Sequence, residues 1–432
     1  MAEKLLNVMT EFDSNAAAMP AGGFPYFTNA DPALSRSSGG RDPLGLLPVW
    51  SAFGRRLVPN LASPVGQVNG IKAVVLIQWL INLDEFQSLL ERNGARRRFF
   101  RLMEGLVEYW LYHNGQPACF GHNALAAGGE RFSVSTGMGK TVANGLYQYY
   151  RGTCRRAGLV DDKWMVPLGV ARQIAGHWTA GATRELKAAL AVPLEPGGKS
   201  LFPGQHLGGA LAKALSGVFN RDTLHQTLQQ CLFGDTDQQT LAREFLALRT
   251  HAATKDLEFK DRVDRLALPQ LADAIDCVQR CEPFLLVMQD AFDYLRGSPG
   301  KRLDLVARDL AAMLPAIGNR AARFVTLASE QDSARMKQMQ LLAENLASAT
   351  KAAPASSEAV LTAFLRELIA YHTRCMKERG RDPMVVIEGD TVLLPVPGDR
   401  APKDASERLA SGRPWMNDYY LNTASNLFGQ LF

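Results

Sequence analysis

The segment Ser135–Thr141 reads STGMGKT and holds the residue types of a phosphate-binding loop. In such loops backbone N–H groups wrap the phosphates of a nucleotide, a lysine meets the terminal phosphates and a hydroxyl holds Mg²⁺. The residues that match the pattern are Gly137, Gly139, Lys140 and Thr141. Val134 stands where the first glycine of the pattern is expected. Nucleotide binding by this segment is therefore one hypothesis for the chain.

The sequence around this segment argues against a nucleotide site. The motif resembles that of helicase-type ATPases, in which the first glycine is often replaced. A phosphate loop, however, follows a buried parallel strand, and such a strand has a continuous apolar sequence. Glu130, Arg131 and Ser133 interrupt the preceding stretch. Two stretches could be the later acidic strand, but FLLVMQD (284–290) has helical spacing and LVDD (159–162) lies too close to the motif. ATP hydrolysis is therefore the alternative and not the leading interpretation.

The same region can instead form a helix with a basic face. Ser135, Thr136 and Gly137 can cap it, and the helix is expected to end at Gly158. The residues on its polar side are Lys140, Asn144, Gln148, Arg151 and Arg155, with Arg156 beside them. LVDDKWMV (159–166) then predicts a short extended wing. The helix and the wing together would make a winged-helix element. Arginine and lysine would hold phosphates and Asn and Gln would read base edges, or the face is simply solvated.

A second basic cluster lies upstream of this helix. It consists of Arg96, Arg97, Arg98 and Arg101. Phe99 and Phe100 interrupt it and are expected to enter the core. Arginine clusters of this kind bind phosphate backbones, although many are only solvated helix faces.

Other residue patterns do not predict catalysis. His113, Cys119 and His122 lie close in sequence, but their spacing fits no standard zinc module and no fourth ligand is evident. His372 and Cys375 lie one turn apart and are interpreted as packing residues. The chain lacks GxSxG and HExxH motifs. We therefore predict no catalytic residues, no metal and no cofactor.

Composition is that of a globular protein. The chain has 432 residues, 47% hydrophobic, with a net charge of +5 and a pI near 8.8. The mild basic excess permits an anionic partner without demanding one. Six scattered cysteines without a CxxC pair indicate reduced thiols. The N-terminal sequence does not resemble a signal peptide and no apolar run is long enough to span a bilayer, so a cytoplasmic protein without membrane contact is expected.

Helical periodicity dominates the chain, and the predicted class is mainly α: a multi-helix body with a winged-helix element and a small C-terminal β-hairpin. The predicted segments are 1–70, an extended arm with short ordered pieces such as LLPVWSAFGRRL; 71–165, a helical hairpin plus the winged-helix module; 166–350, a helical bundle; and 351–432, a helix, hairpin and docked aromatic tail. Within the second segment, helices are expected over 71–92 and 95–113, each ending at Asn-Gly.

Three stretches carry a family resemblance: residues 42–83, the 135–159 region with its LYQYYR sequence, and 372–415. They resemble uncharacterised helical proteins encoded in prokaryotic antiviral defence islands. The resemblance implies a setting beside helicases and nucleases, and it supplies no catalytic residues.

These observations lead to one leading function and two alternatives. The leading hypothesis is a non-enzymatic accessory subunit that binds DNA or a helicase or nuclease partner in antiphage defence. The alternatives are an ATPase that uses STGMGKT and a structural scaffold without nucleic-acid contact.

Overall fold

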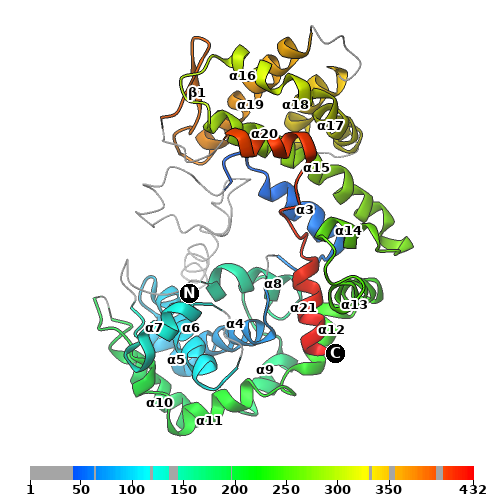
Figure 1. Cartoon of the computed structure of the whole chain (residues 1–432). Coiled ribbons are helices and arrows are strands. Elements are labelled where there is room, and N and C mark those ends of the chain that lie inside the picture. Colours follow the sequence, from blue (N-terminus) through cyan, green and yellow to red (C-terminus); the bar gives the residue numbers. More distant parts are fainter. Residues whose placement is uncertain are drawn as a thin grey trace. The chain divides into compact units, whose positions relative to one another are not determined.

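The structure, a computed structural model, describes residues 42–62, 65–116, 120–135, 145–195, 197–329, 333–349, 356–395 and 402–432 (Figure 1). These residues are mainly helical, and their one sheet is an antiparallel pair near the C-terminus. The predicted fold class, mainly α with a small C-terminal hairpin, is confirmed.

The described chain divides into two compact units. Unit 1 comprises Val58–His251 and Tyr420–Phe432, and unit 2 comprises residues 42–57 and Ala252–Tyr419. This division differs from the four predicted segments, since it cuts the 166–350 bundle at His251. The Pro- and Ala-rich stretch at 351–357 predicted a boundary, but the helices on either side of it pack on each other in unit 2. Such a stretch marks a connection between helices as readily as one between domains.

Unit 1 is built around a buried apolar helix. Its helices are α4 Val68–Ile81, α5 Asp84–Leu90, α6 Ala95–His113, α7 His122–Gly128, η1 Gly129–Arg131, the π-helix η2 Leu146–Tyr150, α8 Arg151–Arg156, α9 Leu168–Ala175, α10 Ala180–Ala191, η3 Pro203–Gln205, α11 Gly209–Val218, α12 His225–Phe233, α13 Thr236–Thr250 and α21 Leu421–Leu431. Nearly every residue of α4 is buried, and α6, η2 and α8 pack on it. This packing places the two predicted basic segments beside one central helix.

The helix predicted over 71–92 is two helices in the structure. Leu83 has extended backbone, and α5 begins again at Asp84 with Glu85 in its first turn. Acidic residues stabilise a helix N-terminus, so this pair favours a new start over continuation. In the part of the chain that is described, no single helix is long and apolar enough to cross a membrane; only α4 and α5 together reach that length, and they are bent by 81°. The neighbouring prediction, 95–113, matches α6.

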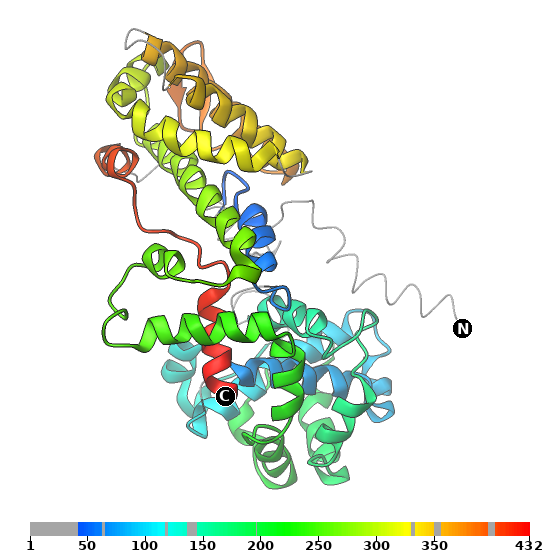
Figure 2. The ribbon, with the colours of Figure 1, turned by 90° about the vertical axis from the view of Figure 1, so that its right-hand side faces the viewer.

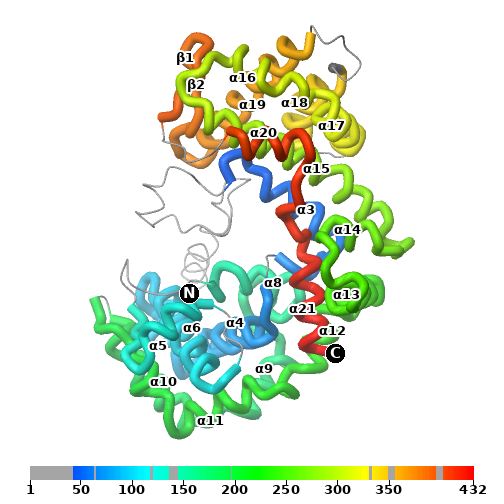
Figure 3. The backbone as a smooth tube through the Cα atoms, viewed as in Figure 1, coloured from blue at the N-terminus to red at the C-terminus, as the bar shows by residue number. Residues whose placement is uncertain are grey.

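The aromatic tail was expected to dock on the body of the protein, and its helical part, α21, belongs to unit 1. Its helix α21 lies beside α13 and packs on it (Figures 2 and 3). Leu421, Leu427 and Leu431 of α21 are buried. Arg249 of α13 fixes it, since Nη1 donates to the Oγ of Ser425 at 2.6 Å. Helix α21 is thus held on α13 by both apolar packing and hydrogen bonds.

Unit 2 is organised on one long helix, α15. Its elements are α3 Leu47–Leu57, α14 Phe259–Asp264, η4 Pro269–Leu271, α15 Ala272–Arg296, α16 Leu303–Leu310, η5 Ala311–Met313, α17 Leu314–Ser329, α18 Ala334–Ala349, α19 Ser357–Glu378, β1 Val386–Glu388, β2 Thr391–Leu393 and α20 Pro402–Ser411. The strands pair antiparallel with Glu388 opposite Thr391, as the hairpin pattern predicts. The ordered piece expected at 46–57 is α3. FLLVMQD lies inside α15 and is helical, as its spacing indicated.

Buried polar side chains tie the elements of unit 2 together. His372 uses both ring nitrogens: Nε2 accepts from the N–H of Met384 at 2.8 Å, so Nδ1 donates to the carbonyl of Pro43 at 2.9 Å. The carboxylate of Glu282 accepts from the hydroxyl of Tyr419 at 2.6 Å. The interpretation of His372 as a packing residue therefore agrees with its contacts.

Candidate nucleic-acid interface

The two predicted arginine clusters meet at one aromatic ring in unit 1. The guanidinium carbon of Arg97, on α6, lies 5.7 Å from the centroid of Tyr147, on η2. Arg151, which opens α8, lies 4.2 Å from the same ring. Phe100 and this ring form a T-shaped pair with 5.1 Å between centroids. Packing therefore joins two segments that are about fifty residues apart in sequence.

A second ring extends this arrangement. Trp164 lies 3.6 Å from the guanidinium carbon of Arg151 and 5.6 Å from that of Arg155. Its backbone has φ of 61°, and its carbonyl accepts a hydrogen bond from the side chain of Asn82 at 3.0 Å. We name Arg97, Tyr147, Arg151, Trp164 and Arg155 the arginine–aromatic stack. Guanidinium groups alternate in it with rings, an arrangement that cation–π attraction stabilises.

A buried carboxylate positions the helix that carries much of this stack. Glu104 of α6 is fully buried and accepts from the N–H of Leu146 at 2.8 Å, at the start of the π-helix. Burial raises the pKa of Glu104 to about 8, although the N–H groups of Leu146, Tyr147 and Gly145 oppose it. Glu108, one turn along, is also buried. Burial raises its pKa well above the usual range, and the charge of nearby Glu104 raises it further. π-Helices are rare and occur frequently at functional sites.

The structure does not gather all the predicted arginines. Arg96 donates to the side chain of Gln87 at 3.3 Å, and Arg98 donates to the carbonyl of Asn93 at 3.2 Å. Both side chains therefore make hydrogen bonds that stabilise the connection between α5 and α6. Arg101 is half-buried beside Glu104, and burial lowers its pKa while Glu104 opposes that shift. Of this cluster, Arg97 is exposed and joins the stack.

The predicted basic face of the second helix needs a correction. Arg151 is 7% exposed, because it is enclosed by Tyr147 and Trp164, so it is not part of a solvated face. Arg155 and Arg156 are exposed, and Gln148 is half-buried. The predicted residues Gly137, Gly139, Lys140, Thr141 and Asn144 lie outside the described residues.

The wing expected at 159–166 is not formed. Residues 157–167 are turns and irregular backbone without a strand. Oδ1 of Asp161 accepts from the N–H groups of Lys163 and Met165, at 2.8 and 2.7 Å. An aspartate that bonds its own following backbone favours a tight turn over an extended strand. The turn directs Trp164 toward Arg151, and the winged-helix prediction is wrong for this segment.

The setting of the STGMGKT segment differs from that of a phosphate loop. Val134, just before it, makes an isolated antiparallel bridge with Leu201. Within the described ranges there is no parallel sheet from which such a loop could project. This context disfavours the nucleotide hypothesis, although most of the motif itself lies outside those ranges.

No metal site emerges from the described residues, which hold no group of three or more potential His, Cys, Asp or Glu ligands. Cys119 lies outside them, while His113 and His122 contact the rings of Tyr109 and Tyr112.

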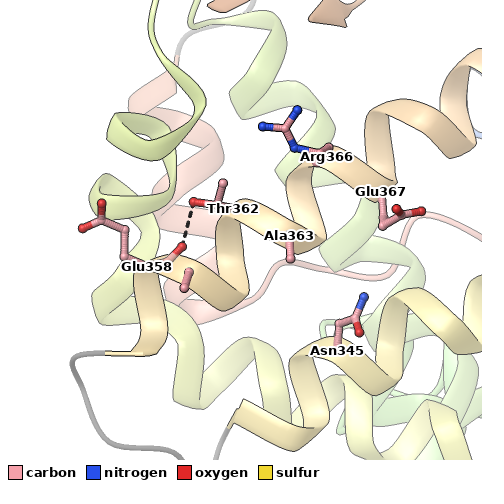
Figure 4. Close-up of a pocket in the computed structure, with 7 residues that line it drawn as sticks. Asn345, Glu358, Thr362, Ala363, Arg366 and Glu367 are labelled. Carbon is pink, nitrogen blue, oxygen red and sulfur yellow. Dashed lines mark hydrogen bonds between the residues drawn. The ribbon is translucent and has the colours of Figure 1, made fainter. Parts of the chain in front are cut away.

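A depression of about 800 Å³ lies between α18 and α19 in unit 2 (Figure 4). The side chains labelled there are Asn345, Glu358, Thr362, Ala363, Arg366 and Glu367. Glu358 pairs with Arg308 at 3.1 Å and Arg366 pairs with Asp390 at 2.8 Å. Because two of its charged side chains, Glu358 and Arg366, are already paired, the depression is a weaker candidate than the stack in unit 1.

Sequence reasoning missed Trp164 and Glu104. An isolated Trp between two acidic residues and a Pro gave no periodic signal, and a glutamate on a mixed helix looks solvated until its neighbours are known.

The charge distribution adds to the case for unit 1, because lysines and arginines outnumber acidic residues over 58–251 and are nearly balanced by them elsewhere. Compared with known proteins, the chain matches no family model, no curated protein and no solved structure.

Proposed function

We propose that unit 1 binds nucleic acid through the arginine–aromatic stack. The observation that carries this proposal is the convergence of Arg97 and Arg155 on rings that Arg151 joins. Both outer arginines are exposed, and neither pairs with a carboxylate among the described residues. An exposed guanidinium without a counter-charge is suited to bind a phosphate oxygen.

The electrostatics of unit 1 favour an anionic ligand. Arg156 adds a third exposed guanidinium beside Arg155, and the surplus of basic residues lies in this unit. Each phosphate that such a surface neutralises releases condensed counterions from the nucleic acid, which favours association at low salt. The acidic residues nearest in sequence are partly engaged, since Asp161 closes its own turn.

The wider setting is part of the same proposal. A non-enzymatic subunit that brings a helicase or nuclease to nucleic acid in antiphage defence fits the resemblance of residues 42–83, 135–159 and 372–415. Co-purification of the chain with its genomic neighbours tests this partner, and ATP turnover that is lost in Lys140→Ala would support the nucleotide alternative instead.

The binding proposal is tested by the salt dependence of affinity. The double variant Arg97→Ala/Arg155→Ala should bind a 30-nucleotide DNA more weakly and reduce the slope of log affinity against log salt by about two, since two phosphate contacts are lost. The matched control is Arg308→Ala/Arg366→Ala, which removes two exposed arginines of unit 2 that are already paired. It should bind like the wild type. A wild type without salt-dependent binding to DNA or RNA would refute the proposal.

A further inference from the structure

We infer that this surface binds the sugar–phosphate backbone of either single or double strands and does not stack bases, with Arg151 and Trp164 acting as positioning residues. The inference rests on the proposed function of the same site and specifies its ligand chemistry. It follows from what the two aromatic rings of the stack already contact.

The rings are occupied by arginines. Tyr147 has the guanidinium carbon of Arg151 at 4.2 Å and that of Arg97 at 5.7 Å from its centroid, and it forms a T-shaped pair with Phe100. Proteins that bind single strands through stacking present aromatic rings on which successive bases can lie. A base that approached Tyr147 would have to displace an arginine, and Arg151 is almost fully buried.

Trp164 is occupied in the same way. Arg151 lies 3.6 Å from its ring centroid and Arg155 lies 5.6 Å away. The ring is half-buried and held at its backbone by Asn82. Trp164 is therefore placed to orient Arg155, because a planar guanidinium that rests on a fixed ring loses less freedom when it binds a phosphate. We therefore expect the two rings to orient the guanidinium groups and not to contact the bases.

The polar residues expected to read base edges do not change this assignment. Gln148 is half-buried on the π-helix, and Asn144 lies outside the described residues. Arg97 and Arg155 are the exposed members of the stack, and each guanidinium can make two parallel hydrogen bonds to phosphate oxygens. Because phosphates occur in every strand form and sequence, base composition should have little effect on affinity.

The decisive probe is an abasic oligonucleotide, which carries the deoxyribose–phosphate backbone without bases. We expect wild-type protein to bind it within about threefold of an oligo-dT of equal length, and a duplex of equal phosphate number similarly. Binding of oligo-dT that is ten or more times tighter than binding of the abasic strand would overturn the inference while leaving nucleic-acid binding intact. Absence of binding to all three probes would overturn both.

Substitutions separate positioning from contact. Arg155→Ala should flatten the salt slope by about one, since a phosphate contact is lost. Trp164→Leu should lower affinity several-fold at every salt concentration without changing the slope, and Trp164→Phe, which restores a ring, should recover most of it. A Trp164→Leu protein that loses binding to oligo-dT but retains binding to duplex would show base stacking and contradict the inference. The abasic comparison uses wild-type protein, so it stands even if Trp164→Leu folds poorly.

Discussion

Arginines have different neighbours in the two units. In unit 2 they meet carboxylates: Nε of Arg408 lies 2.7 Å from Asp290, Arg413 lies 3.3 Å from the same carboxylate, and Arg379 pairs with buried Asp42. In unit 1, Arg97 and Arg155 meet aromatic rings instead. A carboxylate neutralises a guanidinium, whereas a ring fixes its direction and leaves its charge in place. The same residue type can therefore build a core in one unit and present a charged surface in the other.

The buried carboxylates of unit 2 show why their arginines are structural. Burial raises the pKa of Asp290, while Arg408 and Arg413 lower it by stabilising the charged form. A buried ion is costly without a partner, so the two arginines make its burial tolerable. The exposed arginines of the stack, Arg97 and Arg155, form no ion pair with a buried carboxylate among the described residues.

Asp290→Ala should have the largest effect on stability. It removes the carboxylate shared by Arg408 and Arg413, which are only partly exposed, and we expect the free energy of unfolding to fall by about 3 kcal/mol. Urea denaturation measures this change. Asp304→Ala is the control, because its pair with Arg302 is on the surface, and it should have little effect. Equal losses in both variants would remove the distinction between buried and surface pairs.

Arg249→Ala should give the next largest effect and tests an arginine of unit 1 that is structural. Its guanidinium donates to the carbonyl of Asn422 and to the side chains of Ser425 and Asn426. Loss of these contacts should cost about 2 kcal/mol, and hydrogen exchange should rise in α21. Arg243→Ala, which removes an exposed arginine of α13, should leave exchange unchanged. If α21 stayed protected in Arg249→Ala, its docking would rest on apolar contacts alone.

Two buried carboxylates with raised pKa values, Glu282 and Glu104, should make stability depend on pH. Burial raises the pKa of Glu282 in unit 2 to about 7, against hydrogen bonds from Tyr419, Met416 and Asn417. The folded protein then holds a proton that the unfolded chain releases above pH 4.5, so the free energy of unfolding falls as pH rises through this window, by up to about 1.4 kcal/mol per pH unit. Glu282→Gln should flatten the fall up to pH 7.

In unit 1, Glu104→Gln should flatten the same pH dependence up to about pH 8, because the pKa of Glu104 is raised to that value. Melting temperatures between pH 5 and 9 measure both variants. Stability that rose with pH over this range in the wild type would contradict the raised pKa values.

Arg155→Ala should have the smallest effect on stability, below about 0.5 kcal/mol, because Arg155 is exposed and makes no ion pair in the part of the chain that the structure describes. Its effect on nucleic-acid affinity should be much larger than its effect on melting temperature. A large loss of stability would show that Arg155 is structural, and the contrast between the units would then fail.

Local signals predicted the elements that local interactions determine. The ends of α6 follow from Gly94 and from Asn114-Gly115, and the hairpin follows from Gly389, whose φ is +60°. The N-terminus of α13 follows in the same way from Asp235, whose side chain accepts from the N–H groups of Asp237 and Gln238.

The stack could be predicted only in part. The basic residues of both clusters were visible in the sequence, but their convergence on Tyr147 depends on how α6, η2 and α8 pack around α4. The burial of Arg151 depends on Trp164, which reaches it through a turn that was expected to be a strand. Such contacts join separate segments, and a helical period carries no information about them.

The route of the chain through unit 1 has a consequence during synthesis. Arg249 and Asn422, which are hydrogen-bonded, are 173 residues apart in sequence, so the surface of α13 that α21 covers is translated long before α21. At ribosomal rates the interval is roughly ten to thirty seconds. Throughout it, the nascent chain exposes the apolar side chains that Leu421, Leu427 and Leu431 later cover. We therefore expect the chaperone dependence of this protein to vary with the speed of translation across residues 252–420. Synonymous codon changes in that region should then change the yield of folded protein.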